Sequence, residues 1–313
     1  MSESEKVMSE MPSRPAHLDG VDDAELDGPS VMESLNPSTL YVVATPIGHL
    51  GDMSFRAVAV LRKADAILAE DTRHSKKLFA HYGIKPRGLF AMHQHNESSI
   101  AERWLERISR GESVALISDA GTPLVSDPGY ALVKCCVDAG VTVCVVPGPC
   151  AFVAAMSVSG LPCHDFRFVG FLPNKSAARR EQLAQYIDAP STIGFYEAPH
   201  RLEATVADML SVFGATRQCV LAHDLTKRFE SYVRGDLEAC ARAVTLAKPR
   251  GEWVILVAPT LRTPPALTEA WPDGVSQLLV ALKEHLPPKT ASAIVADHYG
   301  VSKKACYQWL VNQ

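Results

Sequence analysis

Residues 114 to 129 read Val-Ala-Leu-Ile-Ser-Asp-Ala-Gly-Thr-Pro-Leu-Val-Ser-Asp-Pro-Gly, and this stretch decides the fold class. A short apolar run ends abruptly in turn-forming residues, which is typical of a buried strand that leads into a long loop. Ordinary strand-to-helix connections take about 2 to 6 residues. A longer loop at the carboxyl end of a core strand favours a ligand site over a plain connection.

The same pattern extends in both directions along the chain. Further apolar strands are predicted at 40–44, 66–69, 88–92 and 141–146, each followed by a polar or Gly/Pro-rich loop. Strand, loop and helix in alternation predict a mostly parallel sheet covered by helices. We therefore expect an α/β domain over residues 39–158.

Further breaks divide the rest of the chain. Gly160-Leu-Pro162 marks a boundary, after which residues 159–260 repeat the strand and helix pattern and predict a second α/β domain. A Pro-rich linker is expected over residues 261–274. Residues 275–313 then have the outline of a small helical, helix-turn-helix-like module.

Composition excludes several classes of protein. The chain has 313 residues, of which 47% are apolar, but no apolar run approaches the roughly 20 residues that cross a bilayer. The N-terminus lacks the layout of a signal peptide, so we expect a cytoplasmic protein. Its eight cysteines include no C-x-x-C pair, which argues against both a disulfide framework and a zinc site.

Charge is distributed unevenly. Residues 1–38 carry nine acidic residues against Lys6 and Arg14, and this composition predicts a disordered acidic tail. The whole chain has a net charge of −4, so the remaining residues carry about +3. A mildly basic body is compatible with a polyanionic partner.

Six motifs, in order along the chain, carry a family resemblance. They are Val43-Ala-Thr-Pro-Ile-Gly-His-Leu50, Ala69-Glu-Asp-Thr-Arg-His74, Ser118-Asp-Ala-Gly-Thr-Pro123, Asp127-Pro-Gly-Tyr130, Val146-Pro-Gly-Pro-Cys-Ala151 and Phe195-Tyr-Glu-Ala-Pro-His-Arg201. The chain thereby resembles the bacterial small-subunit ribosomal RNA (cytidine-2′-O)-methyltransferases of the tetrapyrrole methylase superfamily. His49 is a departure, because the family usually has Asn at that position.

The resemblance implies a fold, a cofactor and partners. It implies two α/β domains with S-adenosylmethionine in the cleft between them, acting as a homodimer. The lack of metal-ligand clusters in the sequence leads us to expect that the cofactor binds without a metal. The substrate that the resemblance implies is a cytidine ribose in the decoding region of small-subunit ribosomal RNA, presented as RNA or as the assembled small subunit. It also places these residues around the cofactor: Pro46, Ser118, Asp119, Ala120, Gly121, Thr122, Val125, Cys150, Ala151 and Tyr196.

Methylation of a ribose hydroxyl requires positioning and a general base, because the hydroxyl is a poor nucleophile. Glu70 and Asp71 directly follow a predicted strand and are our candidates for catalysis. Asp71 is equally well explained as a helix cap that pairs with Arg73. Four other titratable residues remain possible bases: His74, His93, His95 and Glu197. His93 and His95 lack a third ligand at metal spacing, so substrate contact or exposure explains them better than a metal.

Basic residues in two regions are candidates for RNA contact. They are Lys175, Arg179, Arg180 and Arg201 in the second domain, and Lys303 and Lys304 in the helical module. Basic residues on helices are ordinarily just a solvated face, and only the resemblance favours RNA. Trp309 is expected to pack in the core of the module.

Two other functions stay open at this stage. One is a small-molecule methylase of the same superfamily that acts on a tetrapyrrole or on a modified histidine of a protein. Such relatives typically carry G-x-G-P-G-D after the first strand, where this chain has Thr45-Pro-Ile-Gly-His. The other is a DNA-binding ligand sensor, which the helix-turn-helix outline suggests but which does not need so large a body.

Overall fold

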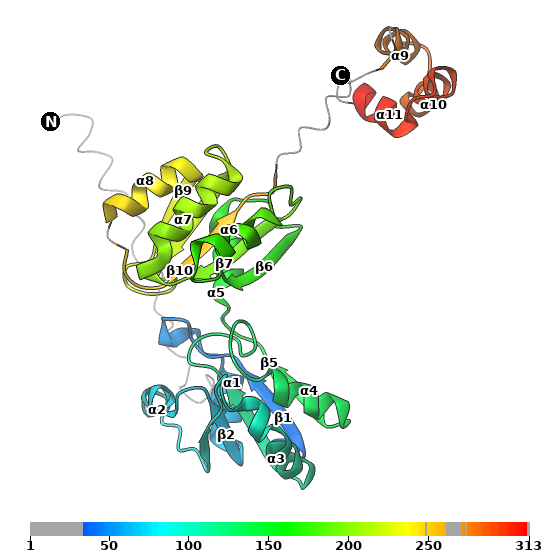
Figure 1. The fold of residues 1–313 in the computed structure, drawn as a ribbon. Coiled ribbons are helices and arrows are strands. Elements are labelled where there is room, and N and C mark those ends of the chain that lie inside the picture. The colour runs from blue at the N-terminus through cyan, green and yellow to red at the C-terminus, as the bar shows by residue number, and fades with distance from the viewer. Residues whose placement is uncertain (1–33, 248, 261–270, 273, 312–313) are drawn as a thin grey trace, which may run out of the picture.

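The computed structural model describes residues 34–247, 249–260, 271–272 and 274–311. Two α/β domains and a small helical module make up the described chain (Figure 1). The predicted disorder of the acidic tail concerns residues 1–38, of which 1–33 lie outside the described residues. Most of the predicted linker, residues 261–270 and 273, lies outside them as well.

The first domain contains a five-stranded sheet in the order β3-β2-β4-β1-β5, and every neighbouring pair is parallel. Its strands are β1 (Thr39–Val43), β2 (Ala66–Ala69), β3 (Leu89–Ala91), β4 (Ser113–Ile117) and β5 (Thr142–Val146). Its helices are α1 (Phe55–Lys63), α2 (Thr72–His81), α3 (Glu97–Ser109) and α4 (Tyr130–Asp138). The predicted alternation is confirmed in this domain.

Helices cover both faces of the first sheet, which is the usual requirement of a parallel sheet. Alternate residues of β4 accordingly enter two different cores. Ala115 and Ile117 pack on the side of α1, whereas Val114 and Leu116 pack on the side of α3 and α4. The strand is buried over its whole length, as its continuous apolar run predicts.

The second sheet has the order β6-β7-β10-β8-β9 and is mixed. Its strands are β6 (Phe166–Phe171), β7 (Thr192–Glu197), β8 (Gln218–His223), β9 (Ser231–Asp236) and β10 (Trp253–Val257). Only β6 and β7 are parallel, because β10 inserts between β7 and β8 antiparallel to both. The second domain is thus an α/β domain, as expected, but its sheet is mixed. No helix separates β8 from β9, and this direct return allows an antiparallel pair.

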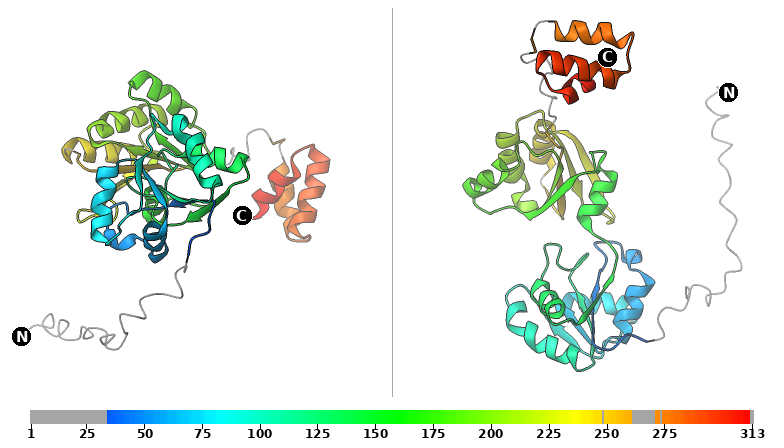
Figure 2. Two further views of the ribbon diagram at one scale, coloured as in Figure 1. Left: turned by 90° about the horizontal axis from the view of Figure 1, so that it is seen from below. Right: turned by 90° about the vertical axis from the view of Figure 1, so that its right-hand side faces the viewer.

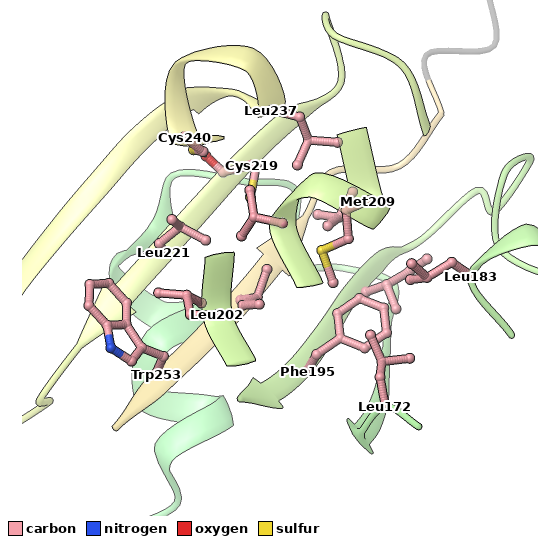
Figure 3. Packing of buried hydrophobic residues seen from close by; sticks show 14 of the residues in the cluster. Leu172, Leu183, Phe195, Leu202, Met209, Cys219, Leu221, Leu237, Cys240 and Trp253 are labelled. Atoms are coloured by element: carbon pink, nitrogen blue, oxygen red, sulfur yellow. The ribbon is translucent and has the colours of Figure 1, made fainter. Parts of the chain in front are cut away.

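Three helices cover the core of the second sheet (Figures 1 and 3). They are α6 (Ser176–Ala184), α7 (Pro199–Phe213) and α8 (Leu237–Ala247). Helix α7 begins at Pro199, because proline is well suited to the first turn of a helix. Phe195, Leu202 and Met209 lie in this core.

Helix α5 (Ala151–Ser159) follows the last strand of the first sheet but packs on the second sheet. Phe152 lies over Gly194 of β7, where an added Cβ would approach the Phe152 ring within 2.1 Å. The boundary expected after residue 158 thus lies at the C-terminal end of α5, although α5 packs on the second sheet. The two domains lie one above the other with α5 where they meet (Figure 2).

The helical module is confirmed. Helices α9 (Val275–Lys283), α10 (Pro288–Tyr299) and α11 (Lys303–Val311) enclose their own apolar core. Trp309 packs partly buried against it, as expected. Across the described part of the chain, no helix combines the length and hydropathy that a membrane span requires.

Candidate functional site

The loop between β4 and α4, residues 118–129, is held at several points. Thr45 and Gly121 exchange backbone hydrogen bonds of 2.8 and 3.1 Å, and the Thr122 hydroxyl donates to the Pro149 carbonyl at 2.9 Å. Leu124 and Ser126 have positive φ angles of 72° and 68°. Non-glycine residues in that region store strain, which is concentrated at functional sites.

This loop forms one wall of a cavity of about 320 Å³ between the two domains. The opposite wall comes from the second domain and includes Phe171, Leu225 and Trp253. Seven of the expected cofactor residues line the cavity: Ala120, Gly121, Thr122, Val125, Cys150, Ala151 and Tyr196. Residues far apart in sequence therefore meet at one site, as the motifs predict.

The other three expected cofactor residues are not among those that line the cavity. Pro46 is buried next to Ile47, which does line it. Ser118 is only 2% exposed, and its carbonyl accepts from the Thr45 hydroxyl at 3.3 Å. Asp119 accepts a hydrogen bond from the Asp71 amide at 3.0 Å. These contacts support the loop, although the three residues do not line the cavity.

Two features of the cavity wall leave room for a ligand. Gly121 has a φ of +87°, and a Cβ there would lie 3.2 Å from the Ile47 side chain. Helix α5 begins at the cavity, and its N-cap residue Cys150 makes no side-chain hydrogen bond to the first turn. Amides of a helix N-terminus that lack intrahelical partners favour an anionic group, although the Phe152 amide here already donates to the Tyr196 hydroxyl.

Tyr196 connects the cavity to α5. Its hydroxyl accepts a hydrogen bond from the Phe152 amide at 3.1 Å. Burial raises the pKa of Tyr196 well above its usual value, so the phenol is neutral at physiological pH. It therefore serves as a fixed polar wall group of the cavity.

Acidic residues gather behind and beside the loop. Burial raises the pKa of Glu70, and the neighbouring Asp119 and Asp71 carboxylates add to that rise. Burial also raises the pKa of Asp127 to about 6, with further contributions from Glu70 and Asp119. Asp127 lines the cavity, whereas Glu70 does not. Asp127 is thus a carboxylate whose protonation changes near neutral pH at the cavity surface.

Sequence reasoning missed Asp127 as a site residue, although it lies within one of the six motifs. The available signal was its place in Asp127-Pro-Gly129, in the loop that already indicated a ligand site. Its burial depends on how the loop folds back, which local sequence does not reveal.

Asp71 has the structural role that sequence reasoning left open. Its carboxylate caps α2 by accepting from the Arg73 amide at 2.8 Å, and it also pairs with the Arg73 guanidinium at 2.8 Å. These hydrogen bonds hold the pKa of Asp71 well below its usual value. Asp71 does not line the cavity. The contacts of Asp71 are therefore those of a helix cap, and they do not support the catalytic role that we predicted for it.

The histidines near the first sheet do not form a metal centre. The His93 and His95 rings lie 6.0 Å apart, and within the described ranges no group of three His, Cys, Asp or Glu side chains is placed to hold a metal. His93 Nδ1 is buried without a hydrogen-bond partner.

The basic candidates separate into buried and exposed residues. Arg179 is only 3% exposed and its guanidinium pairs with Asp208 at 2.7 Å, so its expected RNA contact is corrected to a structural role. Arg201 is largely enclosed and lies 3.2 Å from the Glu197 carboxylate. The remaining four candidates are exposed: Lys175, Arg180, Lys303 and Lys304.

Comparisons with known proteins agree with this architecture. Residues 39–241 match the family described as Tetrapyrrole (Corrin/Porphyrin) Methylases, and residues 268–313 match the RsmI C-terminal HTH domain. Solved structures of diphthine synthase and the methyltransferase CobJ share the fold. The first has a TM-score of 0.54 at 14% identity, covering 71% of this chain and 89% of its own. The second has a TM-score of 0.53 at 20% identity, covering 71% and 93%.

Curated relatives are much more similar. A protein named ribosomal RNA small subunit methyltransferase I from Xylella fastidiosa is 47% identical over 87% of this chain and 98% of its own. Relatives of the same name from Vibrio cholerae and Escherichia coli O157:H7 are 45% and 43% identical. They cover 86% and 88% of this chain and 93% and 95% of their own. The chain therefore belongs to the tetrapyrrole methylase family, within the group that comprises the small-subunit ribosomal RNA methyltransferases.

Proposed function

We propose that the protein is an S-adenosylmethionine-dependent enzyme that methylates the 2′-hydroxyl of a cytidine in the decoding region of small-subunit ribosomal RNA. The observation that carries this proposal is the interdomain cavity, where residues of five of the six motifs converge and include the partly buried acid Asp127. The names of the curated relatives support the ribosomal RNA substrate. The sequence resemblance supports the finer assignment to a cytidine ribose.

The cavity suits the proposed cofactor. Its volume of about 320 Å³ lies within the usual range of ligand pockets. Ile47, Val125 and Leu225 offer apolar contact, and the start of α5 offers amides for a carboxylate. When bound, S-adenosylmethionine would supply an electrophilic methyl group.

Asp127 is the residue best placed to hold the proton of the ribose hydroxyl. It lines the cavity and is ionised above about pH 6. A base with a pKa near the working pH is effective in proton transfer. Glu70, our sequence candidate, does not line the cavity, and its negative charge raises the pKa of Asp127. We assign proton acceptance to Asp127 and an electrostatic supporting role to Glu70.

RNA contact is assigned to the exposed basic residues of both regions. Lys175 is the N-cap residue of α6 and Arg180 lies in the middle of that helix, whereas Lys303 and Lys304 lie in the first turn of α11. Such side chains bind phosphates and position the RNA without reading its sequence. We further propose a homodimer that acts in the cytoplasm, where its ribosomal substrate would be found, and light scattering on the purified protein will test its oligomeric state.

Methyl transfer from radiolabelled S-adenosylmethionine is the test of this function. Three acceptors are compared: small subunits that lack the modification, naked ribosomal RNA, and a porphyrin precursor. We expect label in RNA, at a cytidine whose 3′ linkage has become resistant to alkali because the 2′-hydroxyl is methylated. Label only in the porphyrin would establish the small-molecule methylase instead. Specific DNA binding with no transfer to any acceptor would establish a ligand-sensing regulator.

A further inference from the structure

We propose that Phe171 is a base-stacking residue for the RNA substrate, located at the mouth of the interdomain cavity. This inference rests on the proposed function and deepens it, because it specifies an unpaired nucleobase as the group recognised there. Phe171 lines the cavity, yet its side chain is 55% exposed. A large aromatic side chain left open beside a cavity has lost the favourable burial that most phenylalanines gain.

The backbone of β6 is irregular in a way that directs Phe171 toward this position. Phe168 pairs with Gly194 and Phe171 pairs with Tyr196, with a register shift between Phe168 and Gly170. Gly170 pairs with Phe195, so Val169 is one extra residue in β6 that has no partner in β7, which is a bulge. Because side chains alternate along a strand, Phe168 and Phe171 would occupy opposite faces of a regular strand. The bulge brings them to the same face.

Ring contacts agree with this reading. The Tyr196 ring lies 4.8 Å from the Phe168 ring and 5.8 Å from the Phe171 ring, edge to face in both cases. Phe168 also lies against Phe152 of α5 and is largely covered. One aromatic row thus runs from Phe166, which is also exposed, through covered rings to Phe171. Phe171 is the exposed end that lines the cavity.

Close contact with the first domain accompanies the bulge. Gly170 has a φ of +78°, and a Cβ at this position would lie 2.8 Å from the Ser126 hydroxyl. The strand edge therefore approaches the loop of residues 118–129 directly. This approach places Phe171 next to the wall that carries Asp127, so a ribose at Asp127 would have its base within reach of Phe171.

The chain after Phe171 is fixed by two enclosed arginines. Arg179 donates to the Pro173 and Asn174 carbonyls at 3.3 Å, and Arg201 donates to the Leu172 carbonyl at 2.6 Å. Enclosing charged groups is costly unless they are well paired. Here they hold a short exposed loop in one conformation, and this loop ends at Lys175.

Two basic residues follow Phe171 closely in the sequence. Lys175 is exposed, and the Arg180 side chain retains 51% of its exposure. An aromatic ring beside cationic side chains is the usual arrangement for a single-stranded nucleic acid, in which bases stack and phosphates meet the cations. An RNA strand therefore fits this edge better than a small apolar ligand.

The test compares Phe171→Leu, which keeps apolar volume but removes the aromatic face, with Phe171→Trp, which retains it. Phe55→Ala is the matched control, because Phe55 is also exposed, at 69%, but does not line the cavity. Three quantities are measured: affinity for S-adenosylmethionine by calorimetry, affinity for a short cytidine-containing oligoribonucleotide by fluorescence anisotropy, and kcat/KM on unmodified small subunits.

Loss of one stacked base should weaken oligoribonucleotide binding roughly 10- to 100-fold. We expect this loss in Phe171→Leu, with wild-type values in Phe171→Trp and Phe55→Ala and unchanged cofactor affinity throughout. Wild-type RNA affinity in Phe171→Leu would overturn the proposal, as would an equal loss of cofactor affinity, which would make Phe171 part of the cofactor pocket. Absence of methyl transfer by the wild-type enzyme would count against the proposed function, whereas the oligoribonucleotide comparison would still judge Phe171.

Discussion

The first domain has a parallel sheet whose carboxyl-end loops bring Glu70, Asp119 and Asp127 together. The second domain has a mixed sheet, on which an aromatic row ends at Phe171 near the exposed cations Lys175 and Arg180. In the first domain, burial raises carboxylate pKa values, which suits proton transfer. In the second, burial of Arg179 and Arg201 fixes a loop and leaves other cations exposed. From this contrast we infer, under the proposed function, that the first domain supplies the chemistry and the second holds the substrate.

Replacing the cavity acid should have the largest effect. Asp127→Asn should lower kcat by about 10² to 10⁴, the usual contribution of a general base, with little change in cofactor affinity. In the wild type, kcat should fall as the pH is lowered through about 6, because Asp127 becomes protonated. Single-turnover rates across pH measure both effects. Asp71→Asn is the control, since Asp71 caps α2 away from the cavity. An unchanged rate in Asp127→Asn would remove it from the chemistry.

Removing the buried cation should have the next largest effect, this time on stability. Arg179→Ala leaves Asp208 without its main partner and should cost about 3 to 5 kcal/mol of unfolding free energy. Arg180→Ala, at the neighbouring exposed position, should cost about 1 kcal/mol or less. Denaturant titration distinguishes the two variants. Equal midpoints would contradict the structural role that we assign to Arg179.

The helical module offers a comparison with a third region. Lys303 and Lys304 are exposed in the first turn of α11, and each phosphate contact adds about 0.7 to 0.9 to the salt slope of log K. Lys303→Ala with Lys304→Ala should therefore flatten the slope for RNA binding by about 1.4 to 1.8. Lys76→Ala with Lys77→Ala, an exposed adjacent pair on α2, is the matched control. If both double variants behave alike, the module's lysines are only a solvated face.

The smallest expected effect concerns how the free energy of unfolding depends on pH. The pKa of Asp127 is about 6 in the folded protein and about 3.9 in an unfolded chain, so its ionisation opposes folding as the pH rises through this range. Asp127→Asn should match the wild type at pH 4 and exceed it by roughly 1 to 2 kcal/mol at pH 8, allowing for partial exposure. Thermal or denaturant unfolding at both pH values measures this difference. A variant less stable than the wild type at pH 8 would show that Asp127 is not held in a desolvated position.

The sequence predicts the first domain better than the second for a physical reason. Buried parallel strands such as β4 are continuous apolar runs, and the loops that follow them are marked by Gly, Pro and Asp. Strand direction in the second sheet depends on β10 inserting between β7 and β8, which no local pattern reveals.

Side-chain burial was predicted least well. Arg179 on α6 resembles any exposed helical cation until Asp208, 29 residues away, is seen to pair with it. The bulge at Gly170 likewise results from pairing with β7 and not from β6 alone. The Glu70-Asp71 pair was found by its place after a strand, but only the fold separates a cap from a buried acid.

A single-turnover titration tests most directly whether the two domains divide chemistry and substrate binding between them. Methyl transfer is followed at increasing concentrations of unmodified small subunits for the wild type, Asp127→Asn and the pair Lys175→Ala with Arg180→Ala. The account predicts that Asp127→Asn lowers the rate at saturation and leaves the half-saturating concentration unchanged. The double variant Lys175→Ala with Arg180→Ala should have a higher half-saturating concentration and an unchanged rate at saturation. The reverse assignment, or the same change in both variants, would contradict a first domain for chemistry and a second domain for binding.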